Sequence, residues 1–398
     1  MKIALVSQEY PPETARGGIG SQTYTKAHGL AALGHKVYVI SRSITLDRQV
    51  TISGGVQVIR IPGLEKQLPE MSEPVQWLSH SLLVAAEIET LHAEVNLDII
   101  DFPEWAAEGY AYLLNRTPWK KIPVVIQLHG PLVMLAHTIN WPDIHSVFYK
   151  VGFEMEATSV QLADAIYSSS ECSAQWIRKY YKPVNDNIPV IHMGIDTSSF
   201  LELAKKKYEQ LTITYAGKLV QNKGVEELVT AVILLSKEFN GLKLKLMGKG
   251  DEKFIMKIRE IVDKAEAKEM IDFVGFVDKE NLANEFLKSH VFAAPSYYEG
   301  GPGFVYLEAM ACGLPVIGCS GSGVEEIIDE GINGYMVPPG DVAALTDVLR
   351  KMLLDVGGME RMGKNARAYV VREADSKYCV QKLEAFYYSV LQKSKALV

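Results

Sequence analysis

The chain opens with a short apolar strand, a loop, a helix and a second strand, and this pattern constrains the fold most strongly. The first strand spans Lys2–Ser7, and the Pro- and Gly-rich loop Tyr10–Gly20 precedes a helix that runs to about Leu33. Gly34 ends the helix, and Lys36–Ser41 reads as the second strand. Two parallel strands need a crossover of this kind, so the sequence predicts a parallel sheet.

The same alternation continues through the first half of the chain and restarts after residue 210. Short apolar strands with helices between them indicate sheets that helices cover on both faces. The expected strands are Val56–Ile61, Asp98–Phe102, Pro123–Leu128, Ala165–Ser168 and Ile188–His192, then Leu211–Tyr215, Leu242–Met247, Ile271–Gly275, Val291–Pro295, Pro315–Gly318 and Gly334–Val337. Expected helices in the second half include Val225–Phe239, Lys279–Ser289 and Val324–Glu330.

A chain of 398 residues is too long for one compact core. We therefore predict an α/β protein of two Rossmann-like, doubly wound domains, residues 1–196 and 197–374. Such sheets bind ligands at the carboxyl ends of their strands, so we expect the two domains to face a central cleft. The last helix, in residues 375–398, could pack on the second domain or cross back to the first.

The composition excludes several classes of protein. The net charge is −7, and residues 1–196 carry 15 basic and 20 acidic side chains, so neither nucleic-acid binding nor a polybasic membrane anchor is expected. No signal peptide or membrane-spanning run is recognised, which predicts a cytoplasmic protein, with peripheral contact at the inner face of the membrane left open. The four cysteines lack metal-ligand spacing and are expected to be reduced thiols.

The stretch Glu299–Pro315 (EGGPGFVYLEAMACGLP) carries the strongest chemical signal. A buried strand ends, the chain turns through Gly300, Gly301 and Gly303, and a helix begins. Glycines let backbone approach a ligand, and a helix N-terminus offers N–H groups to an anion such as a diphosphate. Glu299 and Glu308 add acceptors for sugar hydroxyls. From spacing alone, a glycine-rich surface turn explains the stretch equally well.

A family resemblance favours the ligand site. Tyr297–Pro315 resembles the signature region of retaining glycosyltransferases of family 4, which have the GT-B fold. Leu307–Ile317 (LEAMACGLPVI) is the closest part, and Gly331–Gly334 and Val337–Asp341 also match. The resemblance implies a first domain that binds an acceptor and a second domain that binds a nucleotide-sugar.

The resemblance also implies roles for residues of this loop. The family has an E-x7-E motif, whose first glutamate contacts the donor sugar and whose second binds the ribose. Glu299 and Glu308 match these two, although eight residues separate them, one more than usual, and a wider glycine turn could absorb the extra one. The donor-binding residues implied between the two glutamates are Gly300, Gly301, Gly303, Phe304 and Val305.

Two lysines and two glycine turns complete the predicted donor site. The segment Gly217–Gly224 (GKLVQNKG) resembles the family's G-R/K-L-x-x-x-K-G segment, so Lys218 and Lys223 would grip the diphosphate and stabilise the leaving group. Solvated surface lysines are the alternative. The resemblance further places Gly248 and Gly250, with Phe276 and Val277, around the nucleotide base.

In the first domain, Gly17 and Gly18 precede a helix and match a family GG loop against phosphate or acceptor, although a plain turn is also possible. His129 ends the strand Pro123–Leu128 and matches a family HG that is linked to donor-sugar binding. Trp105 and Trp141 are the acceptor candidates, because flat rings suit sugars, with core packing as the alternative. His129, Glu299, Lys223 and Lys218 are the predicted catalytic residues.

No D-x-D sequence occurs, so we expect neither a divalent metal nor any other cofactor. The sequence predicts a retaining hexosyltransferase that uses a UDP- or GDP-sugar, with a glycan, a lipid-linked glycan or a small molecule as acceptor. The alternatives are an epimerase or phosphorylase of the same fold, or a non-catalytic nucleotide-sugar binder. The sequence identifies neither donor, acceptor, linkage nor oligomeric state.

Overall fold

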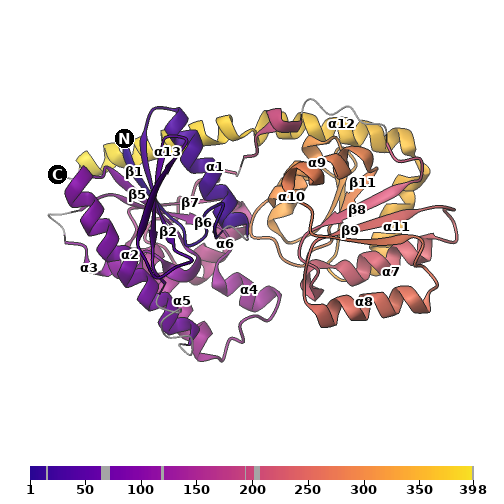
Figure 1. The fold of residues 1–398 in the computed structure, drawn as a ribbon, viewed down its shortest axis with the longest axis horizontal. Coiled ribbons are helices and arrows are strands. Elements are labelled where there is room, and N and C mark those ends of the chain that lie inside the picture. The colour runs from indigo at the N-terminus through magenta and orange to yellow at the C-terminus, as the bar shows by residue number, and fades with distance from the viewer. Residues whose placement is uncertain (15–16, 64–71, 118–120, 193, 201–206, 397–398) are drawn as a thin grey trace. The chain divides into compact units, whose positions relative to one another are not determined.

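The structure, a computed structural model, describes residues 1–14, 17–63, 72–117, 121–192, 194–200 and 207–396. The chain divides into two compact units. The first unit comprises Met1–Gly194 and Ser376–Val398, and the second comprises Ile195–Asp375. The last helix therefore clusters with the first unit (Figure 1).

A mostly parallel, seven-stranded sheet forms the centre of the first unit, in the order β3-β4-β2-β1-β5-β6-β7 among its described residues (Figure 1). β3 pairs antiparallel with β4 at one edge, and the other pairs are parallel. The strands are β1 (Lys2–Val6), β2 (Lys36–Arg42), β3 (Gln49–Ser53), β4 (Val56–Ile61), β5 (Ile99–Pro103), β6 (Val124–Leu128) and β7 (Ala165–Ser168).

Helices cover both faces of this sheet, because successive apolar residues of each strand point to opposite sides. Ile3 and Leu5 of β1 pack in one cluster with α1 and α13, while Ala4 and Val6 pack in another with α2, α3, α5 and α6. The helices are α1 (Gly18–Ala32), α2 (Glu73–Val95), α3 (Tyr110–Asn115), α4 (Leu132–Thr138), α5 (Val147–Leu162), α6 (Glu171–Tyr180) and α13 (Ser376–Ala396), with the 3₁₀ turn η2 (Trp105–Ala107).

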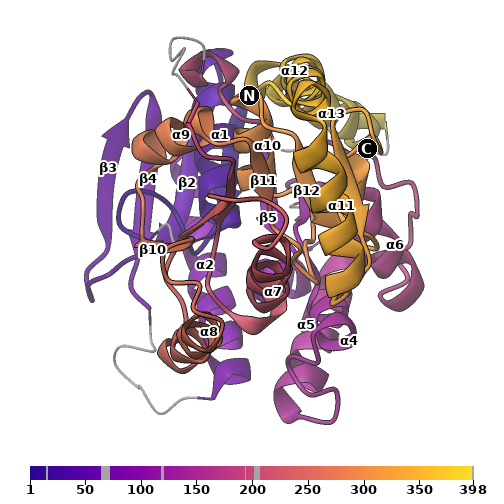
Figure 2. The ribbon, with the colours of Figure 1, turned by 90° about the vertical axis from the view of Figure 1, so that its right-hand side faces the viewer.

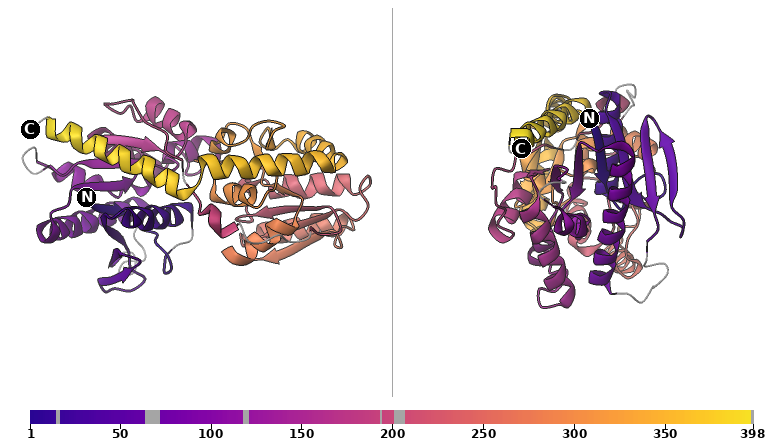
Figure 3. Two further views of the ribbon diagram at one scale, coloured as in Figure 1. Left: turned by 90° about the horizontal axis from the view of Figure 1, so that it is seen from above. Right: turned by 90° about the vertical axis from the view of Figure 1, so that its left-hand side faces the viewer.

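The C-terminal helix α13 runs along the first unit and packs against α1 (Figure 3). Gly29 of α1 permits this close approach, because a Cβ there would overlap the side chain of Val380. Of the helices in the described part of the chain, none is both long enough and apolar enough to cross a membrane.

The second unit repeats the architecture with a six-stranded parallel sheet in the order β10-β9-β8-β11-β12-β13, again among described residues. α7, α8 and α11 pack together on one face, and α9, α10 and α12 on the other (Figure 2). The strands are β8 (Thr212–Ala216), β9 (Lys243–Met247), β10 (Ile271–Gly275), β11 (Val291–Ala293), β12 (Val316–Cys319) and β13 (Gly334–Val337). The helices are α7 (Val225–Leu235), α8 (Glu252–Lys264), α9 (Lys279–Lys288), α10 (Phe304–Ala311), α11 (Val342–Leu354) and α12 (Val356–Glu373), with the 3₁₀ turns η3 (Thr197–Phe200), η4 (Gln221–Lys223) and η5 (Gly323–Glu326).

Both sheets reverse their strand order at one point, and there the loops after two neighbouring strands diverge to opposite faces. In the first unit this switch lies between β1 and β5, and in the second between β8 and β11. The loops that follow β8 and β11 are those singled out above as the donor site. The fold itself therefore brings Gly217–Gly224 and Glu299–Gly303 to one place in the second unit.

Three details of the predicted elements are wrong. Ile188–His192 is not a strand: it makes a single bridge, Val190 to Ser168, because Pro189 has no N–H to continue a ladder. The helix expected at Val324–Glu330 is the short 3₁₀ turn η5. The antiparallel edge strand β3 was not anticipated, since its mostly exposed residues give no apolar pattern.

Candidate active site

An ion pair between Lys223 and Glu299 forms the centre of the candidate site in the second unit. The Lys223 ammonium donates to Glu299 Oε1 at 2.6 Å and to the carbonyl oxygen of Tyr298 at 3.3 Å. The two side chains are 23% and 21% exposed. Both charges are therefore accessible to a ligand, and the switch point unites two residues that lie 76 positions apart.

Glycines allow the loops at this switch point to touch through their backbones. Gly224 has φ +66°, and a Cβ there would overlap the carbonyl oxygen of Pro295. Gly248 has φ +147°, and a Cβ would overlap the carbonyl oxygen of Gly217. A Cβ at Gly250 would meet the backbone of Leu219 in the same way. Gly224, together with the predicted donor-site residues Gly248 and Gly250, therefore allows the segment Gly217–Gly224 to lie against its neighbours.

Gly224→Ala is expected to destabilise the second unit by about 3 kcal/mol or more, because it adds backbone overlap to a left-handed conformation. Gly241→Ala is the matched control: Gly241 has φ +76°, but a Cβ there meets only the flexible side chain of Gln210 at 3.4 Å. The control should cost only about 1–2 kcal/mol. Urea unfolding followed by far-ultraviolet circular dichroism compares the two, and equal losses would contradict the packing argument.

The wide glycine turn after Glu299 packs against the loop that precedes η5. The Glu299 carbonyl accepts a hydrogen bond from the Gly323 N–H at 2.8 Å, and a Cβ at Gly323 would meet the backbone of Gly301. Gly303, at φ +70°, is the N-cap of α10 and has no side chain to cap the helix. The N-cap therefore supplies no acceptor to the first N–H groups of α10. Gly323 was not identified from the sequence.

The remaining predicted residues of the second unit differ in their exposure. Lys218 is exposed, and its carbonyl accepts from the Tyr215 hydroxyl at 2.7 Å. Phe276 is exposed beside the Lys249 ammonium, 5.6 Å from the ring centroid. Gly300 in the turn is buried, and four other residues are partly buried: Val277 after β10, and Phe304, Val305 and Glu308 in α10. Their contact with a donor remains a prediction.

In the first unit, His129 follows β6, and its backbone is held by Glu104. Glu104 Oε1 accepts from the His129 N–H at 2.6 Å and the Gly130 N–H at 2.5 Å. Burial, followed by the positive charge of Lys26, lowers the pKa of His129 to about 3. The imidazole is therefore neutral at physiological pH, and it suits hydrogen bonding to a hydroxyl rather than binding as a cation.

Gly17 is the N-cap of α1, and Gly18 is its first residue. No capping side chain from the described residues covers this helix start, and a Cβ at Gly18 would meet open space. A Cβ at Gly17 would instead lie 3.0 Å from a carboxylate oxygen of Glu9. Gly17 and Gly18 are exposed, and their contact with a ligand remains a prediction.

Trp105 and Trp141 belong to one aromatic cluster that also contains Trp77 and Phe148. The rings of Trp105 and Trp141 stack with centroids 6.3 Å apart, and Trp77 meets Trp105 edge-on at 5.5 Å. Trp141 is 44% exposed, whereas Trp105 is half-buried. Trp141 therefore presents an exposed surface that could receive a sugar, and the ring of Trp105 stacks against it.

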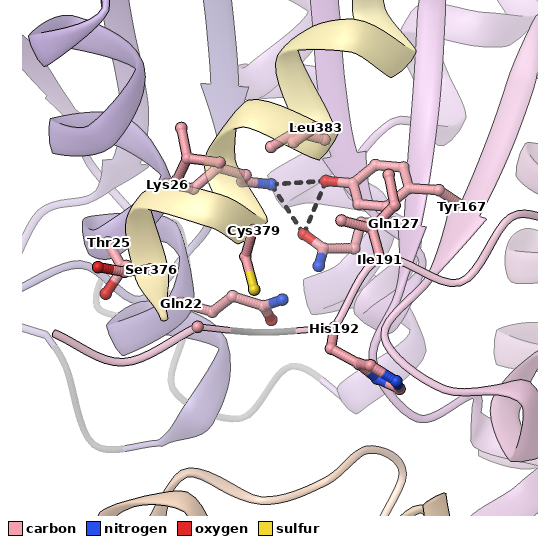
Figure 4. Close-up of a pocket in the computed structure, with 12 residues that line it drawn as sticks. Gln22, Thr25, Lys26, Gln127, Tyr167, Ile191, His192, Ser376, Cys379 and Leu383 are labelled. Carbon is pink, nitrogen blue, oxygen red and sulfur yellow. Dashed lines mark hydrogen bonds between the residues drawn. The ribbon is translucent and has the colours of Figure 1, made fainter. Parts of the chain in front are cut away.

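A small cavity of about 30 Å³ lies beside a buried ionic cluster in the first unit (Figure 4). The Lys26 ammonium donates to Asp101 Oδ2 at 2.9 Å and to Gln127 Oε1 at 2.8 Å. Tyr167 lies 3.1 Å from the same ammonium, and the Tyr387 hydroxyl of α13 also donates to Asp101. The cluster joins α1, β5, β6, β7 and α13. No pattern in the sequence indicates this cluster.

Within the described ranges, no group of three or more His, Cys, Asp or Glu side chains is arranged to hold a metal ion. The residues that sequence reasoning missed are Gly323, Glu104 and the Lys26 cluster. Glu104 lies in the run Asp101–Trp105, where a buried acidic residue directly after a strand could have been noticed.

Comparison with known proteins identifies two family models that match this chain. A model described as Glycosyltransferase Family 4 matches residues 16–199, and one described as glycosyl transferases group 1 matches residues 200–369. Glycogen synthase of Mycobacterium tuberculosis is 25% identical over 391 residues, which cover 94% of this chain and 91% of that protein.

Solved structures share the fold over nearly the whole chain. Sucrose-phosphate synthase from Thermosynechococcus elongatus has a TM-score of 0.80 at 22% identity, covering 98% of this chain and 99% of that one. HepE from Anabaena, solved in complex with UDP and glucose, has a TM-score of 0.75 at 18% identity, with coverages of 98% and 100%. The chain belongs to glycosyltransferase family 4, has the GT-B fold and is a glycosyltransferase.

Proposed function

We propose that this glycosyltransferase moves a hexose from a UDP- or GDP-sugar to a hydroxyl of a glycan, a lipid-linked glycan or a small molecule, with retention of anomeric configuration and without a metal. The observation that carries the proposal is the accessible Lys223–Glu299 pair at the switch point of the second unit, beside the uncapped start of α10. Cation, carboxylate and helix N-terminus are the groups that a diphosphate linked to a sugar requires.

The diphosphate would replace Glu299 as the partner of Lys223, with Lys218 and the N–H groups of α10 as further donors. These groups stabilise the negative charge that builds on the leaving nucleoside diphosphate, which removes the need for a divalent cation. Glu299, released from the ion pair, would then accept hydrogen bonds from hydroxyls of the donor sugar. Glu308 is proposed to bind the ribose.

The proposed reaction is a same-face displacement. The bond from the anomeric carbon to the β-phosphate oxygen breaks, and the acceptor oxygen forms the new bond on the same face. The acceptor proton passes to the leaving phosphate oxygen, so atoms and charge balance without a protein nucleophile. Neutral His129 would hydrogen-bond a sugar hydroxyl, and Trp141, supported by Trp105, would receive the acceptor.

The named relatives support a nucleotide-sugar donor. HepE was solved with UDP and glucose, and glycogen synthase and sucrose-phosphate synthase bear names of sugar-transferring enzymes. Their acceptors differ, so the acceptor of this chain is proposed only as a hydroxyl compound.

A panel of nucleotide-sugars tests the proposal. Purified protein is incubated with each UDP- and GDP-sugar and a mixture of acceptors, and nucleoside diphosphate release is measured with and without EDTA. We expect acceptor-dependent release from one donor, unchanged by EDTA, and an NMR coupling that shows the retained configuration in the product. Release in no combination would contradict the transferase activity, and conversion of the donor to its epimer would contradict transfer to an acceptor. A strict requirement for a metal would contradict the metal-free mechanism.

A further inference from the structure

The backbone of the segment His129–Val133 is held almost entirely by buried side chains. Glu104 Oε1 accepts from the N–H groups of His129 and Gly130, and Glu156 Oε2 accepts from the Leu132 N–H at 2.9 Å. The N–H of Val133 points to the Tyr181 hydroxyl at 3.4 Å, and residue 131 is proline, which has no N–H. Every amide of the segment is thus accounted for by two carboxylates and a phenol.

The two carboxylates that hold this segment are fully buried. Glu104 and Glu156 are each 0% exposed, and Glu156 also accepts from the Tyr181 hydroxyl at 2.6 Å. Each keeps one buried oxygen, Glu104 Oε2 and Glu156 Oε1, without a hydrogen-bond partner among the described residues. The two carboxylates accept from amides only two residues apart, those of Gly130 and Leu132, so two anions here would repel each other. Neither carboxylate forms an ion pair with a cation among the described residues.

We propose that Glu104 and Glu156 share a single proton, carried by Glu156, and that ionised Glu104 is thereby a positioning residue that fixes His129. The two short N–H bonds to Glu104 favour its anion, since charge-assisted bonds are the stronger ones. A proton on Glu156 Oε1 removes the repulsion and leaves its Oε2 free to accept from Leu132. The catalytic consequence for His129 rests on the proposed function above.

The electrostatic surroundings agree with this assignment. Burial raises the pKa of Glu104 to about 7 against the pull of the Gly130 and His129 amides, and burial followed by the charge of Glu104 raises that of Glu156 to about 8. The titratable groups that act on the pair are each other and Tyr181, whose own pKa is raised by burial and by Glu156. Lys26 acts on His129.

Hydrogen exchange of the amides of residues 129–133 tests the proposal without any substrate. Glu104→Gln keeps the oxygen that the two amides contact but removes its negative charge, so exchange of these amides should accelerate at least tenfold. Glu156→Gln mimics the protonated acid and should change exchange less than threefold. Glu87→Gln is the control: it removes another buried carboxylate of this unit, the partner of Arg48, and should leave the segment unchanged.

The pH dependence separates positioning from general weakening of the fold. Because the pKa of Glu156 is raised from 4.5 to about 8 in the folded state, its stabilisation is complete below the lower value and is lost progressively as the pH rises to the higher one. Opening of the segment, corrected for intrinsic exchange, should therefore increase between these two pH values in the wild type and level off above pH 8, and this increase should be absent in Glu156→Gln. The proposal would be overturned if exchange is unchanged in Glu104→Gln. It would also be overturned if Glu156→Gln accelerates exchange as much as Glu104→Gln does.

Activity provides the second arm once a donor is known. Glu104→Gln should lower kcat at least tenfold while KM for the donor changes little, because the donor diphosphate contacts lie on other residues. If no nucleotide-sugar is turned over, the proposed function fails, yet the exchange experiment still decides whether the carboxylate pair holds the His129 segment. A Glu104→Gln that opens the segment but keeps full kcat would refute the catalytic consequence.

Discussion

Glu299→Gln is expected to lower kcat by 10²–10³-fold while nucleoside diphosphate binds at least as tightly as to the wild type. In the unliganded protein Glu299 neutralises Lys223, so a diphosphate must first displace a carboxylate. The amide of glutamine cannot form that ion pair, and Lys223 is then free for the phosphates. The sugar, however, loses a charged acceptor near the reacting carbon, and removal of one such electrostatic group typically costs this much in kcat.

Lys223→Met should show the opposite pattern in binding. Its kcat should fall by a similar factor, because Lys218 alone would then oppose the charge on the leaving group, but affinity for the nucleoside diphosphate should also fall about tenfold or more. Turnover assays together with isothermal titration of UDP and GDP separate the two variants.

His129→Ala should lower kcat strongly and leave nucleotide affinity unchanged, since His129 belongs to the first unit and not to the proposed diphosphate-binding loops.

A matched ion pair provides the control. Lys245 and Glu285 form a pair of similar exposure, 17% and 18%, in the same unit, among residues near the amino-terminal ends of the strands. Glu285→Gln should therefore leave kcat unchanged. The double variant Glu299→Gln, Lys223→Met should be much less impaired than the product of the single effects, because the two residues form one ion pair and are proposed to act in one transition state, Lys223 on the leaving diphosphate and Glu299 on the sugar. Near wild-type turnover in both single variants would remove the pair from the mechanism.

The general positions of Lys223 and Glu299 were predictable from the sequence, but their ion pair was not. Short apolar strands followed by glycine loops identify Lys223 and Glu299 as residues at the carboxyl ends of parallel strands. Which strands are neighbours depends on the order β10-β9-β8-β11-β12-β13, and that order is decided by packing of residues far apart in the chain. The contact between Gly323 and the turn after Glu299 depends on the same order.

Buried polar residues were the harder part to foresee. Glu104 and Glu156 lie 52 positions apart, and no sequence pattern marks them as buried, since a glutamate is most often solvated. Their role as hydrogen-bond acceptors for the amides of residues 129–133 depends on the packing of β5, β6 and α5 against one another. The edge strand β3 was missed for a related reason: it is held by backbone pairing with β4 rather than by burial of apolar side chains.

Lys26→Met is expected to destabilise the first unit by about 3 kcal/mol, equivalent to roughly 10 °C in Tm. It leaves the Asp101 carboxylate buried without a cation, although the Tyr167 hydroxyl, at 2.7 Å, and the Tyr387 hydroxyl still donate to it. Burial, then Asp101, raises the pKa of both tyrosines well above the usual value, so both keep their protons at neutral pH. These two donors limit the loss but do not replace a charge.

Tryptophan fluorescence measures this effect in the first unit alone, because all five tryptophans lie before residue 194. Asp101→Asn should cost a similar amount by leaving the Lys26 ammonium buried. The double variant Lys26→Met, Asp101→Leu removes both charges, so it should be more stable than the sum of the single losses predicts. Arg350→Met, which breaks a pair at the surface of the second unit, should leave the fluorescence midpoint unchanged. If Lys26→Met, like Arg350→Met, leaves the fluorescence midpoint unchanged, the cluster does not stabilise the packing of α13 on the sheet, and the contact of Tyr387 with Asp101 contributes little to stability.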